Sequence, residues 1–214
     1  MKADEATLSL LSKIQEIVAK AHQLEPLGRY RINNVCGVDV SYNKEKAVAA
    51  AVLWSCSEKK VMEVARQIGK PLFPYVSGYL FMREAPFVIS VVRALKENID
   101  LVLVDGHGIA HPRRSGLAVF VGLTLDMPTL GIAKSLLIGR IGPSKDMIAP
   151  MILDGSIVGV AFKVKEGGKT YYASPGHKLT VEDSMGIIQS NRSDLIKALE
   201  SAHRSARMLS PKGR

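Results

Sequence analysis

The chain contains the stretch Leu101-Val-Leu-Val-Asp105-Gly-His-Gly108, in which four apolar residues run directly into a carboxylate and a glycine-rich segment. A short, continuous apolar run of this kind predicts a central strand that is buried on both faces of a sheet. Asp105 then stands at the carboxyl end of that strand, where open α/β sheets gather their ligands. The stretch therefore predicts an α/β fold with a polar site at the strand ends.

The residues before this stretch predict one helix and an antiparallel meander. Apolar residues recur at helical spacing over residues 5–24, which is typical of an amphipathic helix. Three largely apolar segments follow, separated by short polar turns, and they predict strands near residues 34–42, 46–56 and 60–68. Such short connections favour antiparallel pairing of consecutive strands.

The residues after the meander predict alternating helices and strands. A helix over about 85–97 would hold Pro86 in its first turn, where proline is well tolerated. We expect a helix near 114–125, a strand at 129–133, a hairpin at about 156–174, helices near 180–190 and 193–207, and a loose tail at 210–214. This order predicts a mixed α/β sheet, with an antiparallel three-strand meander plus parallel strands, flanked by helices. We take residues 1–214 as a single domain.

The composition bounds the class of protein and its partners. Apolar residues make up 47% of the chain and charged residues 23%, which suffices for a large core and excludes a disordered chain. The 29 Lys and Arg residues exceed the 20 Asp and Glu residues, which gives a formal net charge of +9. This excess favours nucleic acid as a partner, and a generally solvated basic surface is the alternative.

Membrane and zinc-binding classes are disfavoured. No apolar run is long enough to cross a bilayer, and the first residues resemble no signal peptide, so we expect a cytoplasmic protein without a membrane partner. Cys36 and Cys56 lie in apolar, strand-like segments without the spacing of a zinc site. We expect both to be buried free thiols.

Three acidic residues predict a metal site. Asp39 and Asp105 stand at the ends of apolar runs, where an unpaired carboxylate is costly, so each needs a partner. Glu84 offers a third acid. Hard oxygen donors on separate elements of a basic chain predict a Mg²⁺ site that acts on phosphates. Taken singly, Asp39 also fits an exposed edge strand, Asp105 a capped basic turn, and Glu84 the first turn of a helix.

Five segments together resemble the motifs of the endonuclease V family, nucleases that attack strands containing deaminated adenine. Residues 73–84, FPYVSGYLFMRE, resemble the family's Pro-Tyr-x-Pro-Gly-x-Leu-x-Phe-Arg-Glu, and residues 104–113, VDGHGIAHPR, resemble its Asp-Gly-x-Gly-x-x-His-Pro-Arg. Residues 37–42, 131–135 and 174–177 are similar to its first acidic strand, its Gly-Val-Ala-Lys-Ser segment and its late loop. The matches keep the family's order and span most of the chain.

The resemblance implies a ribonuclease H-like fold and gives roles to the acids. In that family the residues matching Asp39 and Asp105 hold Mg²⁺, with Mn²⁺ as a possible substitute, and the residue matching Glu84 completes the catalytic group. Lys134 matches the family's lysine, which would contact the phosphate or activate water. Without its flanking residues, Lys134 is an ordinary loop lysine.

The resemblance also implies a site that recognises a base. Tyr75 matches the family's wedge tyrosine, which enters the duplex beside the lesion; a buried structural tyrosine is the alternative. Gly78, Leu80 and Gly106 match positions that line the family's pocket for the everted hypoxanthine, where small residues permit close approach of the main chain. His111 matches a histidine near the metal and the phosphate, and it could equally brace its loop.

The sequence departs from the family's motifs in two places. Ser77 stands where the wedge motif commonly has a second proline, which would leave the loop less rigid. Val119 and Phe120 replace the usual Ser-His pair and remove a polar side chain near the site. His177 lies in a matched loop without an assigned role, and His203, in the last predicted helix, is expected at the surface.

The resemblance implies a metal-dependent DNA repair endonuclease that recognises deoxyinosine. It would hydrolyse the second phosphodiester bond on the 3′ side of the lesion and leave 3′-hydroxyl and 5′-phosphate ends. The expected partner is inosine-containing DNA, with RNA as a second possibility, and the expected state is a monomer. A related nuclease for inosine-containing RNA or branched DNA, and a noncatalytic nucleic-acid-binding protein, remain open as alternatives.

Overall fold

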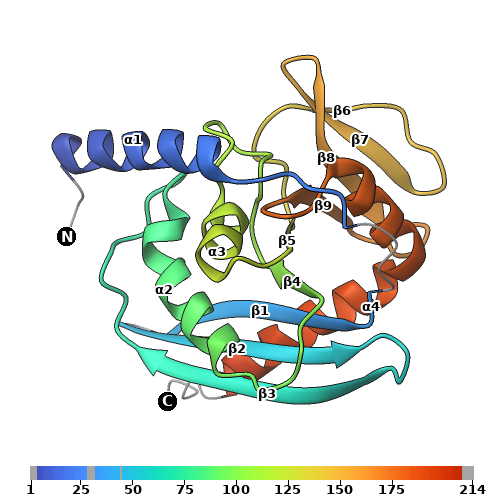
Figure 1. The fold of residues 1–214 in the computed structure, drawn as a ribbon, viewed down its shortest axis with the longest axis horizontal. Coiled ribbons are helices and arrows are strands. Elements are labelled where there is room, and N and C mark those ends of the chain that lie inside the picture. Colours follow the sequence, from blue (N-terminus) through green and yellow to red (C-terminus); the bar gives the residue numbers. More distant parts are fainter. Residues whose placement is uncertain (1–3, 28–31, 44, 209–214) are drawn as a thin grey trace.

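A nine-stranded sheet forms the centre of the fold. The computed structural model describes residues 4–27, 32–43 and 45–208, so the loose tail expected at 210–214 lies outside the described residues. The strands run in the order β3-β2-β1-β4-β5-β9-β8-β7-β6 (Figure 1). The first three are β1 (Asn34–Asn43), β2 (Lys46–Ser55) and β3 (Lys60–Gly69). Each pairs antiparallel with the next, which confirms the predicted meander.

The middle of the sheet is parallel. Strand β4 (Leu101–Val104) pairs in parallel with β1 on one side and with β5 (Thr129–Ala133) on the other. All four residues of β4 are buried, as expected of a strand that elements cover on both faces. The apolar stretch that ends at Asp105 is thus the central strand that the sequence predicted.

Four further strands extend the sheet beyond β5. They are β6 (Arg140–Ile141), β7 (Ile148–Leu153), β8 (Ser156–Lys163) and β9 (Thr170–Pro175). The hairpin of β8 and β9 was predicted, whereas β6 and β7 were not. Strand β7 contains Pro150, which lacks the N–H group that a ladder uses and therefore disguises the strand in the sequence.

Helices cover both faces of the sheet. They are α1 (Glu5–Ala21), α2 (Leu80–Arg93), α3 (Leu117–Leu125) and α4 (Val181–Met208). Helices α2 and α3 share a core with β1, β2 and β4 on one face, and α4 packs on the other face (Figure 1). Two large apolar cores result, one on each side of the sheet, and a smaller third cluster includes Ile109, Val119 and Met151.

Two predicted helices differ from those in the structure. Helix α2 begins at Leu80 and ends at Arg93, so Pro86 lies inside the helix and not in its first turn. The two helices expected after residue 180 are one continuous helix, α4. The polar residues Asn191-Arg192-Ser193 have a weak preference for turns and so favour a break in the helix. The apolar stripe nevertheless continues from Ile188 to Leu195 and packs on the sheet, and this packing overrides the local preference.

Side chains alternate along β1, and this alternation determines toward which face of the sheet each polar side chain points. Val38 belongs to the core beneath α2, and Val35 belongs to the core beneath α4. Because side chains alternate along a strand, Asp39 shares the α4 face with Val35. Tyr42 falls on the α2 face, where its hydroxyl reaches Glu84. The strand therefore sends one acidic site residue toward α4 and binds another on α2.

Two further predictions concern the cysteines and membrane segments. Cys36 and Cys56 are both free and buried, as expected. Among the residues that the structure describes, no helix is long and apolar enough to cross a membrane.

Candidate active site

Asp39 and Asp105 lie next to each other at the carboxyl ends of β1 and β4. In the parallel register of these strands, Val38 is opposite Val104, and the aspartates follow these two residues. The backbone N–H of Asp105 donates to the carbonyl oxygen of Val38 at 3.4 Å, which continues the pairing to this point. Asp39 is therefore not an exposed edge residue.

Asp39 is buried and held by a histidine that the sequence prediction placed at the surface. Only 8% of Asp39 is exposed, and its Oδ2 lies 2.9 Å from Nδ1 of His203 on α4. The hydroxyl of Ser41 donates to the same oxygen at 3.4 Å. Burial and the negative charge of Asp105 raise the pKa of Asp39. The side chain of His203 is 43% exposed, as expected of a surface residue, but α4 packs closely on β1 and brings this ring to the carboxylate, a role that was not predicted.

Asp105 is paired with Lys134, which follows β5. The distance between Nζ of Lys134 and Oδ2 of Asp105 is 2.5 Å, although 65% of the lysine side chain is exposed. Burial lowers the pKa of Lys134, but the carboxylates of Asp105 and Asp39 outweigh this effect and raise it. Lys134 is thus a cation held against the acidic pair and accessible from solvent.

Glu84 approaches the aspartates from the other face of the sheet. It is buried on α2 and accepts a 2.9 Å hydrogen bond from the hydroxyl of Tyr42, whose ring lies 4.2 Å beneath the guanidinium of Arg83. Burial raises the pKa of Glu84 to about 7, and the nearby Asp39 and Asp105 add to this rise against the lowering effect of Tyr42. Glu84 is therefore set up to exchange a proton near neutral pH.

The donor chemistry fits a hard divalent cation held by two carboxylates. Asp39 and Asp105 carry adjacent oxygens, and their mutual repulsion is a cost that a bound cation would relieve. Within residues 4–27, 32–43 and 45–208, no group of three His, Cys, Asp or Glu side chains converges closely enough to hold a metal ion. Glu84 stays apart because it comes from the opposite face. Mg²⁺ commonly uses one or two carboxylates with waters and phosphates, so a pair suffices.

A cavity of about 320 Å³, here called the Gly78 cavity, opens beside the acidic pair. Its lining includes all five residues predicted to bind the substrate, together with two residues of the active site: Tyr75, Gly78, Leu80, Gly106, His111, Asp105 and Lys134. Two buried polar atoms of its walls, Nδ1 of His107 and Oγ of Ser115, have no hydrogen-bond partner among the described residues. Both atoms are buried within the walls, where an unpaired polar group is costly.

Hydrogen bonds from three side chains hold the loop that carries Gly78 in place. Gly78 has φ of +81°, a conformation that favours glycine. Its carbonyl oxygen accepts from Gln15 Nε2 at 3.0 Å and from Arg113 Nη2 at 3.2 Å. The backbone N–H of Arg113 donates to Nδ1 of His111, which leaves Nε2 of that ring to donate to the Gly78 carbonyl at 3.2 Å. These contacts favour the loop-bracing reading of His111.

Gln15 is a site residue that the sequence prediction missed. It is buried on α1 and also donates to the carbonyl oxygen of Ser115, while its own oxygen accepts from Arg113 Nε at 2.6 Å. The available signal was a glutamine within the apolar stripe of an amphipathic helix, between Leu11 and Val18. A buried amide at such a position needs partners, and here they support the wall of the Gly78 cavity.

Tyr75 is exposed at the mouth of the Gly78 cavity. Its exposed fraction is 70%, which contradicts the alternative of a buried structural tyrosine. Phe120, one of the departures from the family's motifs, stacks on Phe81 with ring centroids 3.7 Å apart, and Phe81 lines the cavity. The apolar replacement thus supports the start of α2.

His177 has a structural role. The ring is buried, its Nδ1 accepts from the backbone N–H of Gln23, and its own backbone N–H donates to Oγ1 of Thr129. These bonds tie the segment after α1 to the start of β5.

The comparisons with known proteins agree with this geometry. The Endonuclease V family model matches residues 15–203. Endonuclease V of Sulfolobus acidocaldarius is 39% identical over 205 residues, which cover 96% of this chain and 97% of the relative.

Solved structures give the same result. The crystal structure of endonuclease V from Streptomyces avermitilis superposes with a TM-score of 0.85 at 30% identity and covers 97% of this chain and 93% of its own. Endonuclease V of Ciona intestinalis, crystallised with a 24-mer DNA containing an inosine followed by a ribo-adenosine, has a TM-score of 0.81 at 26% identity over 95% of this chain and 98% of its own. The predicted ribonuclease H-like fold is confirmed by these likenesses.

Proposed function

The chain belongs to the endonuclease V family, and on this basis we propose that it is a metal-dependent DNA repair endonuclease specific for deoxyinosine. It hydrolyses the second phosphodiester bond on the 3′ side of the lesion and leaves a 3′-hydroxyl and a 5′-phosphate. One observation carries the proposal: Asp105 and Lys134 border the cavity whose walls carry the predicted base-binding residues. Recognition of a base and attack on the strand would then take place within one continuous site.

In this proposal the acidic pair holds the metal ion and Lys134 holds the phosphate. Asp39 and Asp105 supply the carboxylate oxygens for Mg²⁺, which Mn²⁺ can replace. When bound, the ion lowers the pKa of a water molecule and offsets charge that develops on the phosphate. His203 fixes the orientation of Asp39 through its 2.9 Å hydrogen bond. Lys134, which pairs with Asp105 and is exposed, would supply the positive charge that contacts a phosphate oxygen.

Glu84 supplies a group that exchanges protons in the proposed reaction. Its pKa near 7 suits a side chain that takes a proton from the attacking water, while the leaving 3′-oxygen takes a proton from solvent. The hydrogen bond from Tyr42 keeps the carboxyl group oriented toward the aspartates while α2 shields it from solvent.

The Gly78 cavity receives the everted base in this proposal. Its main-chain wall at Gly78 and Gly106 permits close approach of the base. Tyr75, exposed beside the cavity, stacks where the base has left the helix, which offsets part of the unstacking cost of a few kcal/mol.

A labelled oligonucleotide tests the proposal. With Mg²⁺, a strand carrying one deoxyinosine should yield a 5′ fragment that ends one nucleotide beyond the lesion, and the matched deoxyadenosine strand should stay intact. Asp105→Asn should bind the strand without cutting it. If the native protein binds the deoxyinosine strand and never cuts it with Mg²⁺ or Mn²⁺, the noncatalytic alternative holds.

Inosine-containing RNA is a second candidate substrate. The observation in its favour is the Ciona intestinalis relative, whose crystallised strand places a ribo-adenosine directly after the inosine. Cleavage of otherwise identical strands with ribose or deoxyribose at that position distinguishes the two substrates. A large preference for the ribose strand would make RNA the main target.

A further inference from the structure

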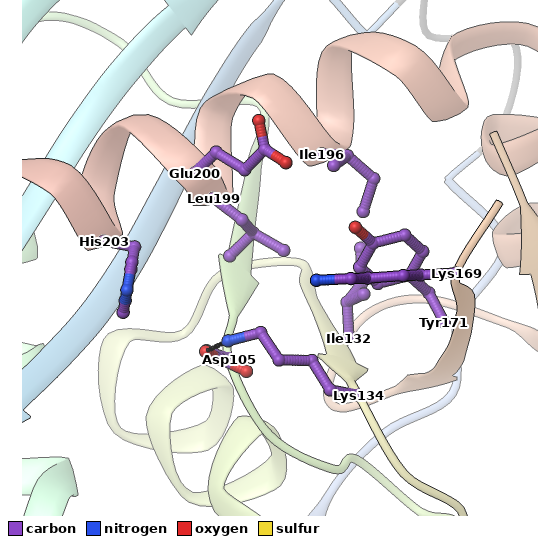
Figure 2. Close-up of a pocket in the computed structure, with 9 residues that line it drawn as sticks. All are labelled: Asp105, Ile132, Lys134, Lys169, Tyr171, Ile196, Leu199, Glu200 and His203. Carbon is purple, nitrogen blue, oxygen red and sulfur yellow. Dashed lines mark hydrogen bonds and ion pairs between the residues drawn. The ribbon is translucent and has the colours of Figure 1, made fainter.

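A second cavity, here called the Tyr171 cavity, opens on the other face of the sheet. It has a volume of about 230 Å³ and shares only Asp105 and Lys134 with the Gly78 cavity. Its remaining walls come from α4 and from the strands β5 and β9 (Figure 2). Asp105 and Lys134 therefore line both cavities, one bordered by α2 and α3 and the other by α4.

The walls of the Tyr171 cavity suit a nucleoside. Ile196 and Leu199 of α4 form an apolar side, and the ring of Tyr171 lies across from them (Figure 2). Such a slot accepts the flat face of a base and stacks it on the aromatic ring, whichever base it is. Glu200 at the rim provides an acceptor for the amino groups of a base and disfavours a phosphate at that point.

Lys169 places a positive charge at the Tyr171 cavity. Its amino group points into the Tyr171 cavity toward Lys134 (Figure 2). Within the described ranges, Lys169 makes no ion pair, in contrast to Lys134, which is held by Asp105. An unpaired lysine at the rim of a catalytic cleft fits a phosphate of a bound strand.

The Tyr171 cavity continues into a basic depression. The adjoining space of about 330 Å³ shares Lys169, Tyr171 and Glu200 with it, and adds Lys165 and Lys197. Three lysines thus face one carboxylate along this depression. The amino group of Lys197 lies 5.9 Å from the centre of the Trp54 ring, so this lysine also contacts an aromatic residue of β2. The track leads away from the acidic pair and carries a net positive charge.

We propose that the Tyr171 cavity binds the nucleoside directly 3′ of the cut, and that Lys165, Lys169 and Lys197 hold the backbone of the strand beyond it. The inference rests on the proposed function, in which the lesion occupies the Gly78 cavity. With the lesion on one side of the acidic pair and the cut phosphate at the pair, the strand leaves on the other side. This track is the opening that continues there, and it would hold the product that carries the 5′-phosphate.

A series of strands with different 3′ ends tests the proposal. Each strand carries one deoxyinosine, and its scissile phosphate is followed by a propyl spacer, by one nucleotide or by four nucleotides. For the native protein, kcat/KM should rise about 5- to 150-fold when one nucleotide replaces the spacer, which is the range for one stacked base. A further rise should follow with four nucleotides as the lysines engage phosphates.

Matched variants assign these gains to the track. Tyr171→Leu should lose the gain from the first nucleotide, and Tyr171→Phe, which keeps the ring, should retain it. Lys165→Ala combined with Lys197→Ala should lose the gain from the longer strand and lower the slope of log kcat/KM against log salt by about 0.7 per lost phosphate contact. Lys60→Ala removes one positive charge on the edge strand β3, where Lys60 pairs with Glu58, and should retain both gains.

The outcomes separate the two proposals. Equal kcat/KM for the spacer strand and the four-nucleotide strand would overturn the track, as would lysine variants that behave like Lys60→Ala. No cleavage of any deoxyinosine strand by the native protein would instead refute the proposed function. Because the lysines are exposed, their variants should fold, so a loss seen with them reports on binding.

Discussion

At the scale of single residues, two carboxylates lie side by side, which costs free energy because their charges repel. Asp39 and Asp105 meet at the ends of adjacent parallel strands, and each is satisfied by a cation or a hydrogen-bond donor from another element. His203 holds the first and Lys134 the second. Both partners also lie on the Tyr171 cavity, so a strand bound there would contact the groups that set the charge of the acidic pair.

His203 should affect the reaction through Asp39. His203→Ala removes the donor at 2.9 Å and is expected to lower metal affinity or kcat about 10- to 100-fold, as loss of a supporting hydrogen bond usually does. His203→Asn retains a donor and should recover part of the loss. The apparent Mn²⁺ affinity of each variant checks this, and an unchanged affinity in His203→Ala would show that the hydrogen bond does not orient the carboxylate.

Glu84 should make stability depend on pH in a defined direction. The unfolded chain releases this proton near its ordinary pKa of 4.5, whereas the folded protein keeps it up to about 7. The folded state therefore binds more protons in this interval, and its free energy of unfolding should fall as pH rises from about 4.5 to 7, by about 3 kcal/mol from this group.

Glu84→Gln removes this dependence. Urea unfolding without divalent cations should show the variant gaining stability relative to the native protein as pH rises through this range, even though the variant loses activity. The comparison cancels the opposite effect of His107 and His111, whose burial lowers the pKa of each to about 4. A constant difference between the two proteins at all pH values would contradict the assigned pKa.

At the scale of elements, the packing of α4 on β1 determines where the site residues meet. A β-carbon added to Gly37 would lie 2.6 Å from the backbone carbon of Ala198, so the helix approaches the strand too closely for any side chain. This approach brings His203 to Asp39. It also explains why the sequence did not reveal the contact, since the two residues are 164 positions apart and only the packing joins them.

Gly37→Ala should therefore destabilise the protein by about 1–3 kcal/mol, the usual cost of overpacking, because backbone atoms of α4 must move. Gly186→Ala is a matched control on α4, where an added β-carbon meets nothing within 4 Å, and it should stabilise the protein by up to about 1 kcal/mol. Thermal unfolding measures both. A Gly37→Ala protein as stable as the native one would show that α4 is free to shift.

The sequence predicted the elements with strong apolar patterns and missed those set by packing. The meander, β4, β5 and the β8–β9 hairpin follow from alternation and short turns, and they were found where expected. The start of α2 and the continuity of α4 depend on tertiary contacts that override local preference. Likewise the residues of the Gly78 cavity were predicted through motifs, whereas Gln15 and the Tyr171 cavity required the structure.

At the scale of the whole molecule, the cavities on the two faces of the sheet meet at the carboxyl ends of the central strands and form one site. The α2 side offers a cavity for a base, and the α4 side offers a basic track for the departing strand. Asp39 and Asp105 stand where these faces meet. The formal net charge of +9 draws a polyanion to this surface, and the acidic pair is a place where a divalent cation can bind between protein and phosphate.

Anomalous diffraction from a crystal grown with Mn²⁺ and an uncleavable deoxyinosine strand tests the central claim most directly. We predict a Mn²⁺ peak within coordination distance of one carboxylate oxygen from Asp39 and one from Asp105. A saturated complex with the base in the Gly78 cavity and no Mn²⁺ at these two carboxylates would contradict it.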